Sequence, residues 1–208
     1  MAQGAIIEQA IGGLRLYPAV KRALDVVVSA LGLAVSLPLW VLVGLAIVLE
    51  NGRPIFYTQS RVGMGGRVFR VVKFRSMIRD AEKYSGPVFA EADDPRITRV
   101  GRLLRKTAMD ELPQVWNILK GDMSFVGPRP ERPEFVWEFA SRIPGYAVRH
   151  QVRPGLTGMA QVYQHYAAAA EEKLVFDLLY IRRCSLLVDV MLFFKSWGNT
   201  LLGRWGAG

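Results

Sequence analysis

A run of 24 residues without a charged side chain, residues 26–49, constrains this chain more than any other feature. A straight helix of that length would extend about 36 Å, enough to cross a hydrocarbon core of about 30 Å. Pro38 lies near the middle of the run and removes one helical hydrogen bond, which favours a kink. The hydroxyl of Ser36 is close enough to satisfy a backbone group that the proline frees. The run is too long and too far from Met1 for a cleaved signal peptide, so we expect a bent membrane helix.

Positive charges flank this run on both sides. Arg15, Lys21 and Arg22 precede it, and six arginines and lysines follow it between residues 53 and 75. Positive side chains mark the cytoplasmic side of a membrane, so both ends favour the same side. A re-entrant helix that enters, bends at Pro38 and returns satisfies both flanks. A kinked span is the alternative, and the residues leave both topologies open.

The composition indicates what the chain contacts. Its net charge is +9 and 51% of its residues are hydrophobic, which together suit an anionic and apolar partner such as membrane lipid. A nucleic-acid binder would explain the charge but not the hydrophobicity, so we expect no nucleic-acid partner. Cys184 is the only cysteine and there are two histidines, which excludes an intrachain disulfide and a zinc site of the usual kind.

The rest of the chain is predicted to be α+β and mostly helical. Two β-prone segments, 54–59 and 67–74, flank a glycine-rich turn and predict a β-hairpin. Helices are expected over 75–84, 97–106, 110–119, 133–142, 171–183 and 186–202. The last of these is apolar enough to lie in a core or in the membrane interface. Residues 123–133 and 143–158 are predicted to be irregular. We divide the chain into an N-terminal segment with the membrane helix, 1–50, and a compact membrane-associated domain, 51–208.

The adjacent carboxylates Asp110 and Glu111 are the first candidates for chemistry. Pro113 follows closely, and proline fits only the first turn of a helix, so Asp110 is predicted at or next to the N-cap. There a carboxylate or a phosphate is stabilised by about 0.3–1 kcal/mol. Taken alone, such a pair most simply caps a helix.

The surroundings of this pair favour a catalytic role. Arg105 lies just upstream, and a rigid loop rich in glycine and proline carries Arg129 downstream. Arginine binds phosphate through two parallel hydrogen bonds. Carboxylates and arginines without histidine suit magnesium-assisted phosphoryl chemistry. The residues alone therefore predict a phosphoryl or phosphoglycosyl enzyme at a membrane surface.

Several sequence blocks carry a family resemblance. They are KRALD (21–25), the apolar run with its proline, KFRSM (73–77), DDPRITRVGRLLRKT (93–107), DELPQVWNILKGDMSFVGPRP (110–130) and RPGLTG (153–158). With these blocks the chain resembles the monotopic phosphoglycosyl transferases, bacterial sugar transferases that begin polysaccharide and glycoconjugate assembly on polyprenyl phosphate. The resemblance extends from about Lys21 to Asp189. The chain departs from the family where Leu37 separates Ser36 from Pro38, and where Met159 replaces a common aromatic residue.

The resemblance implies a fold, a location and a reaction. A compact, mostly helical catalytic domain with a small β-hairpin and interfacial helices would lie on the cytoplasmic face of the inner (plasma) membrane, held by a re-entrant helix. The donor would be a UDP-sugar and the acceptor polyprenyl (undecaprenyl) phosphate. Asp110 would attack the β-phosphorus, release UMP and form a sugar-phosphoryl aspartate, which the acceptor then attacks. Glu111, together with Asp110, would hold Mg²⁺ and orient the phosphates.

The same resemblance assigns the substrate-binding residues. Arg105 and Arg129 match the phosphate-binding arginines of the family, with Arg129 following Pro128 in a Pro-Arg-Pro turn. Lys73 matches the basic residue of the hairpin block. Arg153, in the RPG block, either supports the floor of the site or forms a surface ion pair.

Two other functions are compatible with parts of the sequence. A membrane-anchored basic binding module for anionic lipid or nucleic acid would explain the charge and the apolar run, but not Asp110 and Glu111 beside Arg105 and Arg129. An enzyme of the same fold that uses another phosphate donor is the second alternative. No residue distinguishes glucose, galactose or an N-acetylated sugar, and a homodimer stays among the expected partners.

Overall fold

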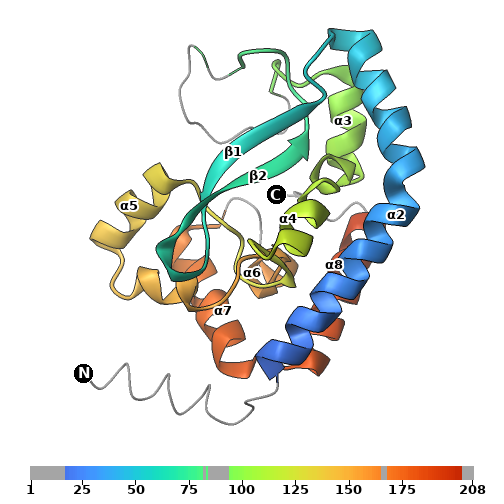
Figure 1. Cartoon of the computed structure of the whole chain (residues 1–208). Coiled ribbons are helices and arrows are strands. Elements are labelled where there is room, and N and C mark those ends of the chain that lie inside the picture. The colour runs from blue at the N-terminus through green and yellow to red at the C-terminus, as the bar shows by residue number, and fades with distance from the viewer. Residues whose placement is uncertain (1–16, 82, 84–93, 165–167, 203–208) are drawn as a thin grey trace.

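The computed structural model describes residues 17–81, 83, 94–164 and 168–202, and these are mostly helical, with two small sheets (Figure 1). The helices are α2 (Tyr17–Asn51), α3 (Arg99–Lys106), α4 (Gln114–Lys120), α5 (Pro133–Arg142), α6 (Met159–Tyr163), α7 (Ala170–Arg183) and α8 (Leu186–Leu201). Short 3₁₀ turns are η1 (Met64–Gly66), η2 (Met109–Glu111) and η3 (Tyr146–Gln151). The strands are β1 (Phe56–Val62), β2 (Val68–Phe74), β3 (Ser124–Val126) and β4 (Gly155–Thr157). The predicted α+β, mostly helical class is confirmed.

Helix α2 contains the apolar run and is long and apolar enough, by length and composition, to cross a membrane. Its 35 residues extend about 52 Å. Pro38 lies inside it without interrupting it, and Figure 1 shows the helix changing direction about midway. The Oγ of Ser36 lies 3.4 Å from the carbonyl oxygen of Leu33, one residue before the Ala34 carbonyl that a proline at position 38 leaves without its helical donor.

The N-terminal end of α2 is fastened to the rest of the molecule by polar contacts. Lys21 Nζ pairs with Asp189 of α8 at 2.6 Å. The guanidinium of Arg22 donates to the last carbonyls of α4, those of Ile118 and Leu119, at 2.6 and 2.7 Å. These contacts add donors at the end of α4, where the carbonyl of Ile118 also accepts from Gly121 N at 3.0 Å.

The C-terminal end of α2 is fastened to the same body. The carboxylate of Glu50 accepts the backbone N–H groups of Arg99 and Val100, the first residues of α3, at 2.7 and 2.9 Å. The side chain of Arg75 donates to the carbonyl oxygen of Asn51 at 3.0 Å. Both ends of the apolar helix therefore contact the folded domain.

The predicted β-hairpin is confirmed, with β1 and β2 antiparallel from Phe56↔Phe74 to Val62↔Val68. The residue that attaches α4 to this hairpin, Asn117, was not predicted from the sequence. Its Oδ1 accepts from Val72 N at 3.0 Å and its Nδ2 donates to Arg70 O at 2.8 Å, so its buried amide replaces a strand partner along β2.

Both segments that were predicted to be irregular, 123–133 and 143–158, contain regular structure. Strands β3 and β4 pair in parallel, Ser124 with Gly155 and Val126 with Thr157. Three-residue strands lack the length that makes a period-2 pattern readable. Glycine permits this pairing, because a Cβ on Gly155 would overlap the main chain of Gly127.

The helix expected over 75–84 is wrong for the residues that the structure describes there, 75–81 and 83. Their backbone groups bond to distant segments instead: Arg75 N donates to Ile55 O at 2.9 Å, and Ile78 N donates to Arg96 O at 2.8 Å. Long-range pairing overrides the local helix preference. Residues 82 and 84 lie outside the described residues.

Candidate active site

The acidic pair lies in a 3₁₀ turn rather than at the start of a helix. One helix was predicted over 110–119, but the structure has the turn η2, which contains Asp110 and Glu111, and then α4, which begins at Gln114. Pro113 lies between them and has no N–H to continue the hydrogen-bond ladder. The prediction that Asp110 lies at or next to the helix N-cap is therefore wrong, and the helix dipole is not its source of stabilisation.

A strained residue directs this turn. Ala108 has φ 54° and ψ 16°, the left-handed conformation that costs a non-glycine residue about 1 kcal/mol or more. Its N–H donates to Arg105 O and its carbonyl accepts from Glu111 N, at 3.1 and 3.2 Å. Ala108 therefore reverses the chain between the end of α3 and the acidic turn.

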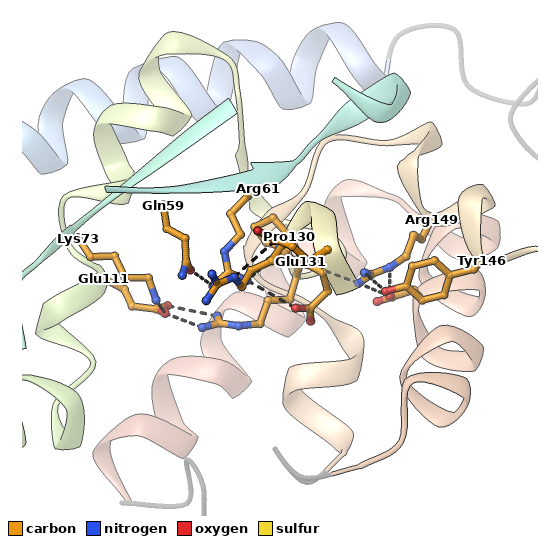
Figure 2. Close-up of polar contacts among 12 residues, drawn as sticks. Gln59, Arg61, Lys73, Glu111, Pro130, Glu131, Tyr146 and Arg149 are labelled. Atoms are coloured by element: carbon orange, nitrogen blue, oxygen red, sulfur yellow. Dashed lines mark hydrogen bonds and ion pairs between the residues drawn. The ribbon is translucent and has the colours of Figure 1, made fainter. Parts of the chain in front are cut away.

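Glu111 is held between two cations from distant segments (Figure 2). Lys73 Nζ, on β2, and Arg129 Nη2, in the loop after β3, each lie 2.6 Å from Glu111 Oε1. Arg129 Nη1 adds a contact of 3.3 Å to Oε2. Burial alone would raise the pKa of Glu111, but the charges and hydrogen bonds of Arg129 and Lys73 outweigh it and hold that pKa well below its usual range. Glu111 is thus a firmly ionised carboxylate.

Asp110 has the opposite electrostatic character. Its side chain is buried, and burial raises its pKa above the usual value. Lys73 lowers the pKa, Glu111 raises it, and Arg105 and Arg129 lower it by less. Adjacent carboxyl groups whose pKa values are displaced in opposite directions are typical of sites that give the two groups different roles.

The other predicted site residues lie at different distances from this pair. Arg105, in the last turn of α3, donates from Nε to Ser76 Oγ at 2.9 Å, and its charge acts on Asp110. Pro128 lines a small pocket together with Arg129. Arg153 donates from Nε to Gly121 O at 3.1 Å, at the far end of α4 from the acidic pair. The structure therefore gathers Lys73, Glu111 and Arg129, and places the side chain of Arg153 elsewhere.

Two further arginines adjoin the Pro-Arg-Pro turn and were missed from the sequence. Figure 2 shows one row of polar side chains, with Lys73 and Glu111 at one end, Arg61 near the middle, and Arg149 and Tyr146 at the other end. Arg61 donates to Pro130 O at 3.0 Å, and Arg149 donates to the carbonyl oxygen of Arg129 at 2.8 Å. Neither follows from a motif or a periodicity, because both contacts are between side chains and the backbone of a distant loop.

The donor set limits how Mg²⁺ could be held. Among the described residues, no group of three or more histidine, cysteine, aspartate or glutamate side chains converges on a metal position. Magnesium is commonly bound by one or two carboxylates together with substrate phosphates and water. Asp110 and Glu111 fit that arrangement, with Lys73 and Arg129 competing for Glu111.

Comparison with known proteins identifies the family of the chain. Residues 16–203 match the family model described as "Bacterial sugar transferase". A protein of Aeromonas hydrophila, named UDP-N-acetylgalactosamine-undecaprenyl-phosphate N-acetylgalactosaminephosphotransferase, is 44% identical over 191 residues, which are 90% of this chain and 45% of that protein. The UDP-glucose:undecaprenyl-phosphate glucose-1-phosphate transferase of Caulobacter vibrioides is 43% identical over 85% of this chain and 67% of its own length.

A third relative is similar in length. The exopolysaccharide production protein ExoY of Sinorhizobium fredii is 35% identical over 95% of this chain and 93% of its own length. The chain thus spans about half of the Aeromonas relative and nearly all of the Sinorhizobium relative. The predicted resemblance is confirmed, and the chain belongs to the bacterial sugar transferase family, a family of enzymes that transfer sugar phosphates.

Proposed function

We propose that the chain transfers a sugar-1-phosphate from a UDP-sugar to undecaprenyl phosphate, through a covalent intermediate on Asp110 and with release of UMP. The observation that carries the proposal is the buried Asp110 beside a Glu111 that Lys73 and Arg129 hold in place. The names of the Aeromonas and Caulobacter relatives describe transfers to undecaprenyl phosphate, which supports the same acceptor here. A binding module without activity does not agree with the family.

The reaction would proceed in two displacements at one phosphorus atom. An oxygen of the ionised Asp110 attacks the β-phosphorus of the donor, and the bond from that phosphorus to the bridging oxygen breaks. UMP leaves with that oxygen, and the sugar-phosphoryl aspartate is left. An oxygen of undecaprenyl phosphate then attacks the same phosphorus, the Asp110 carboxylate leaves, and the product is an undecaprenyl diphosphate sugar. A nucleophilic carboxylate thus divides one difficult displacement into two easier ones.

The residues around Asp110 would have separate tasks. Burial leaves Asp110 poorly solvated and raises its pKa, which makes the ionised form a stronger nucleophile. Arg129, whose side chain is 30% exposed, and Lys73 place positive charge where phosphate charge develops. Glu111 holds these two cations in position. Mg²⁺ bound by Asp110 and Glu111 with the donor would neutralise the charge of the diphosphate.

Helix α2 supports a location for the reaction at the membrane. Both of its ends contact one folded domain, which supports a re-entrant helix whose ends are on the same, cytoplasmic face of the inner membrane. Its outward side chains are apolar, including Leu31, Val35 and Leu42. Helix α8 also exposes large apolar side chains, including Leu187 and Phe194, as an interfacial helix would. Such a site at headgroup level can reach a soluble donor and a lipid-anchored acceptor.

The covalent step is tested with purified enzyme, donor and Mg²⁺ in the absence of acceptor. Because the relatives named above use different sugars, UDP-sugars are first screened for UMP release. Intact-mass measurement should then show one added sugar-phosphate, mapped to Asp110. Asp110→Asn should lose both adduct and turnover, whereas Asp122→Asn, a matched change beyond the other end of α4, should retain both. An adduct on Glu111, or kinetics that require both substrates to be bound together, would contradict the scheme.

A further inference from the structure

We propose that Arg149 is a positioning residue for Arg129, whose main chain it holds so that the Arg129 guanidinium is aimed at the acidic pair. The inference rests on the proposed phosphate-binding role of Arg129. Arg149 lies in η3 and is separated from the site by the Pro-Arg-Pro turn, so it would act only through Arg129.

The backbone of the turn is held at four successive carbonyl groups. Those of residues 128, 129, 130 and 131 accept, in order, from Gly155 N at 2.9 Å, Arg149 Nη2 at 2.8 Å, Arg61 Nη1 at 3.0 Å and Val62 N at 2.9 Å. Residues 128 and 130 are prolines, which have no N–H to bond and a fixed φ. The carbonyl groups are therefore the means by which the rest of the fold can fix the direction of the Arg129 side chain.

The donor to the carbonyl of Arg129 is itself held rigidly. Arg149 is 5% exposed, and its Nε and Nη2 lie 2.9 and 2.8 Å from Asp177 Oδ2 of α7. Its Nη1 donates to the hydroxyl of Tyr146 at 2.9 Å (Figure 2). All three guanidinium nitrogens thus have partners, and Nη2 serves both Asp177 and the turn.

A purely stabilising role explains this arrangement less well. A buried ion pair offers little net stability, because the desolvation of both charges offsets their attraction. Apolar side chains would fill the same space between η3 and α7, but they would not donate to the carbonyl of Arg129. What the buried arginine adds is a fixed donor at Arg129, whose guanidinium pairs with Glu111. A displacement of about 1 Å at a catalytic group lowers rates by about a hundredfold.

The test is a double-mutant cycle with Arg149→Lys and Arg129→Lys, measured as kcat/KM for the UDP-sugar. Lysine keeps the charge of Arg149 but not the three-way donation, so Arg149→Lys should lower kcat/KM by about tenfold to a hundredfold. If Arg149 acts through Arg129, the double variant should be little worse than Arg129→Lys alone.

Arg75→Lys is the matched control, because Arg75 is also 5% exposed and donates to main-chain carbonyls, but at the end of α2. The fold decrease in kcat/KM that Arg75→Lys causes should multiply with that of Arg129→Lys. Thermal unfolding should show stability losses of similar size in Arg75→Lys and Arg149→Lys. If Arg149→Lys does not fold, Tyr146→Phe removes one partner of Arg149 and keeps the ring, and the same cycle is run with it.

The outcomes separate this inference from the proposed function. Wild-type activity in Arg129→Lys would refute the phosphate-binding role of Arg129, and the inference with it. An impaired Arg129→Lys combined with an unimpaired Arg149→Lys would overturn the inference alone. So would effects of the two changes that multiply, because Arg149 would then stabilise the fold without acting through Arg129.

Discussion

At the scale of single residues, the surroundings of two adjacent carboxyl groups displace their pKa values in opposite directions. Glu111 meets Lys73 and Arg129 at 2.6 Å each and keeps its charge, whereas burial raises the pKa of Asp110. The difference does not come from the chain around them, because both lie in one 3₁₀ turn. It comes from which of the two side chains faces the cations that β2 and the Pro-Arg-Pro turn supply.

Replacing Arg129 tests the more exposed of these cations. Arg129→Ala should lower kcat/KM for the UDP-sugar by at least about a hundredfold, because a donor to developing phosphate charge is lost. Arg129→Lys should lower it by about tenfold, because a point charge does not replace a planar fork on phosphate. Arg142→Ala is the control, since Arg142 is half-exposed, pairs with Glu138 and Glu171, and lies over the ring of Phe139. Equal activity of Arg129→Lys and wild type would show that Arg129 contributes only a positive charge in the loop and does not bind phosphate through its planar fork.

His150 gives a prediction for stability against pH. Burial, and to a lesser extent the charge of Arg149, lowers its pKa to about 4, and among the described residues its buried Nε2 atom has no hydrogen-bond partner. An unfolded histidine titrates near 6.5, so the unfolded state binds the proton first as the pH falls. The free energy of unfolding should therefore decrease between about pH 6.5 and pH 4.

The measurement is urea unfolding at several pH values for wild type and His150→Phe. The variant cannot take up this proton, so its free energy of unfolding should depend less steeply on pH over that interval. Parallel curves for the two proteins would show that His150 has the same pKa in the folded and unfolded states, contrary to the lowered pKa that its burial implies.

The residues of the site were predictable where a local pattern or the family motif names them. Asp110, Glu111, Lys73 and Arg129 were named from the sequence, and the structure brings the last three into direct contact. Which carboxylate would meet the cations was not predictable, because it depends on the left-handed Ala108 and on a loop 18 residues away. Local periodicity carries no information about such contacts.

At the scale of elements, helices were predicted well where packing follows the local pattern. Helix α5 has the predicted bounds, 133–142, and α7 and α8 differ from 171–183 and 186–202 by one residue each. Prediction failed where backbone groups pair over long distances, as in residues 75–81 and in the β3–β4 pair. The prediction of one helix over 110–119 failed for a third reason, since Pro113 separates the 3₁₀ turn from α4.

Replacing Glu50, which caps the start of α3, tests the link between α2 and the helix that carries Arg105. Glu50→Ala removes the acceptor for Arg99 N and Val100 N and should lower the free energy of unfolding by about 1 kcal/mol. Glu50→Gln should cost less, because the amide oxygen still accepts. Thermal unfolding in detergent measures both, with Glu138→Ala, on the exposed face of α5, as a control that should change little. A loss in Glu138→Ala as large as that in Glu50→Ala would show that the cap contributes nothing specific.

At the scale of the whole molecule, the apolar helix and the candidate site form one assembly. The N-terminal end of α2 satisfies the last carbonyls of α4, and its C-terminal end caps α3. The acidic turn lies between these two helices in the chain and contacts both α3 and β2. The same residues that fasten α2 therefore support the segments that carry Arg105, Asp110 and Glu111.

This arrangement leads to a prediction about topology. A helix of about 52 Å that spans a bilayer straight would place its ends on opposite sides, about 30 Å of hydrocarbon apart, so one folded domain could not contact both. With Cys184→Ser as background, Val20→Cys and Arg53→Cys mark the two ends of α2. In intact cells, an impermeant thiol reagent should label neither position from the periplasm, and both should react after the membrane is opened. Pro38→Ala restores the helical hydrogen bond at the bend and favours one straight helix, so a fraction of that variant should gain a periplasmic label at one end. Labelling of Val20→Cys from the periplasm in the protein that retains Pro38 would establish a kinked span instead. The contacts of Lys21, Arg22 and Glu50 with one folded domain could then not all form in the membrane-inserted protein.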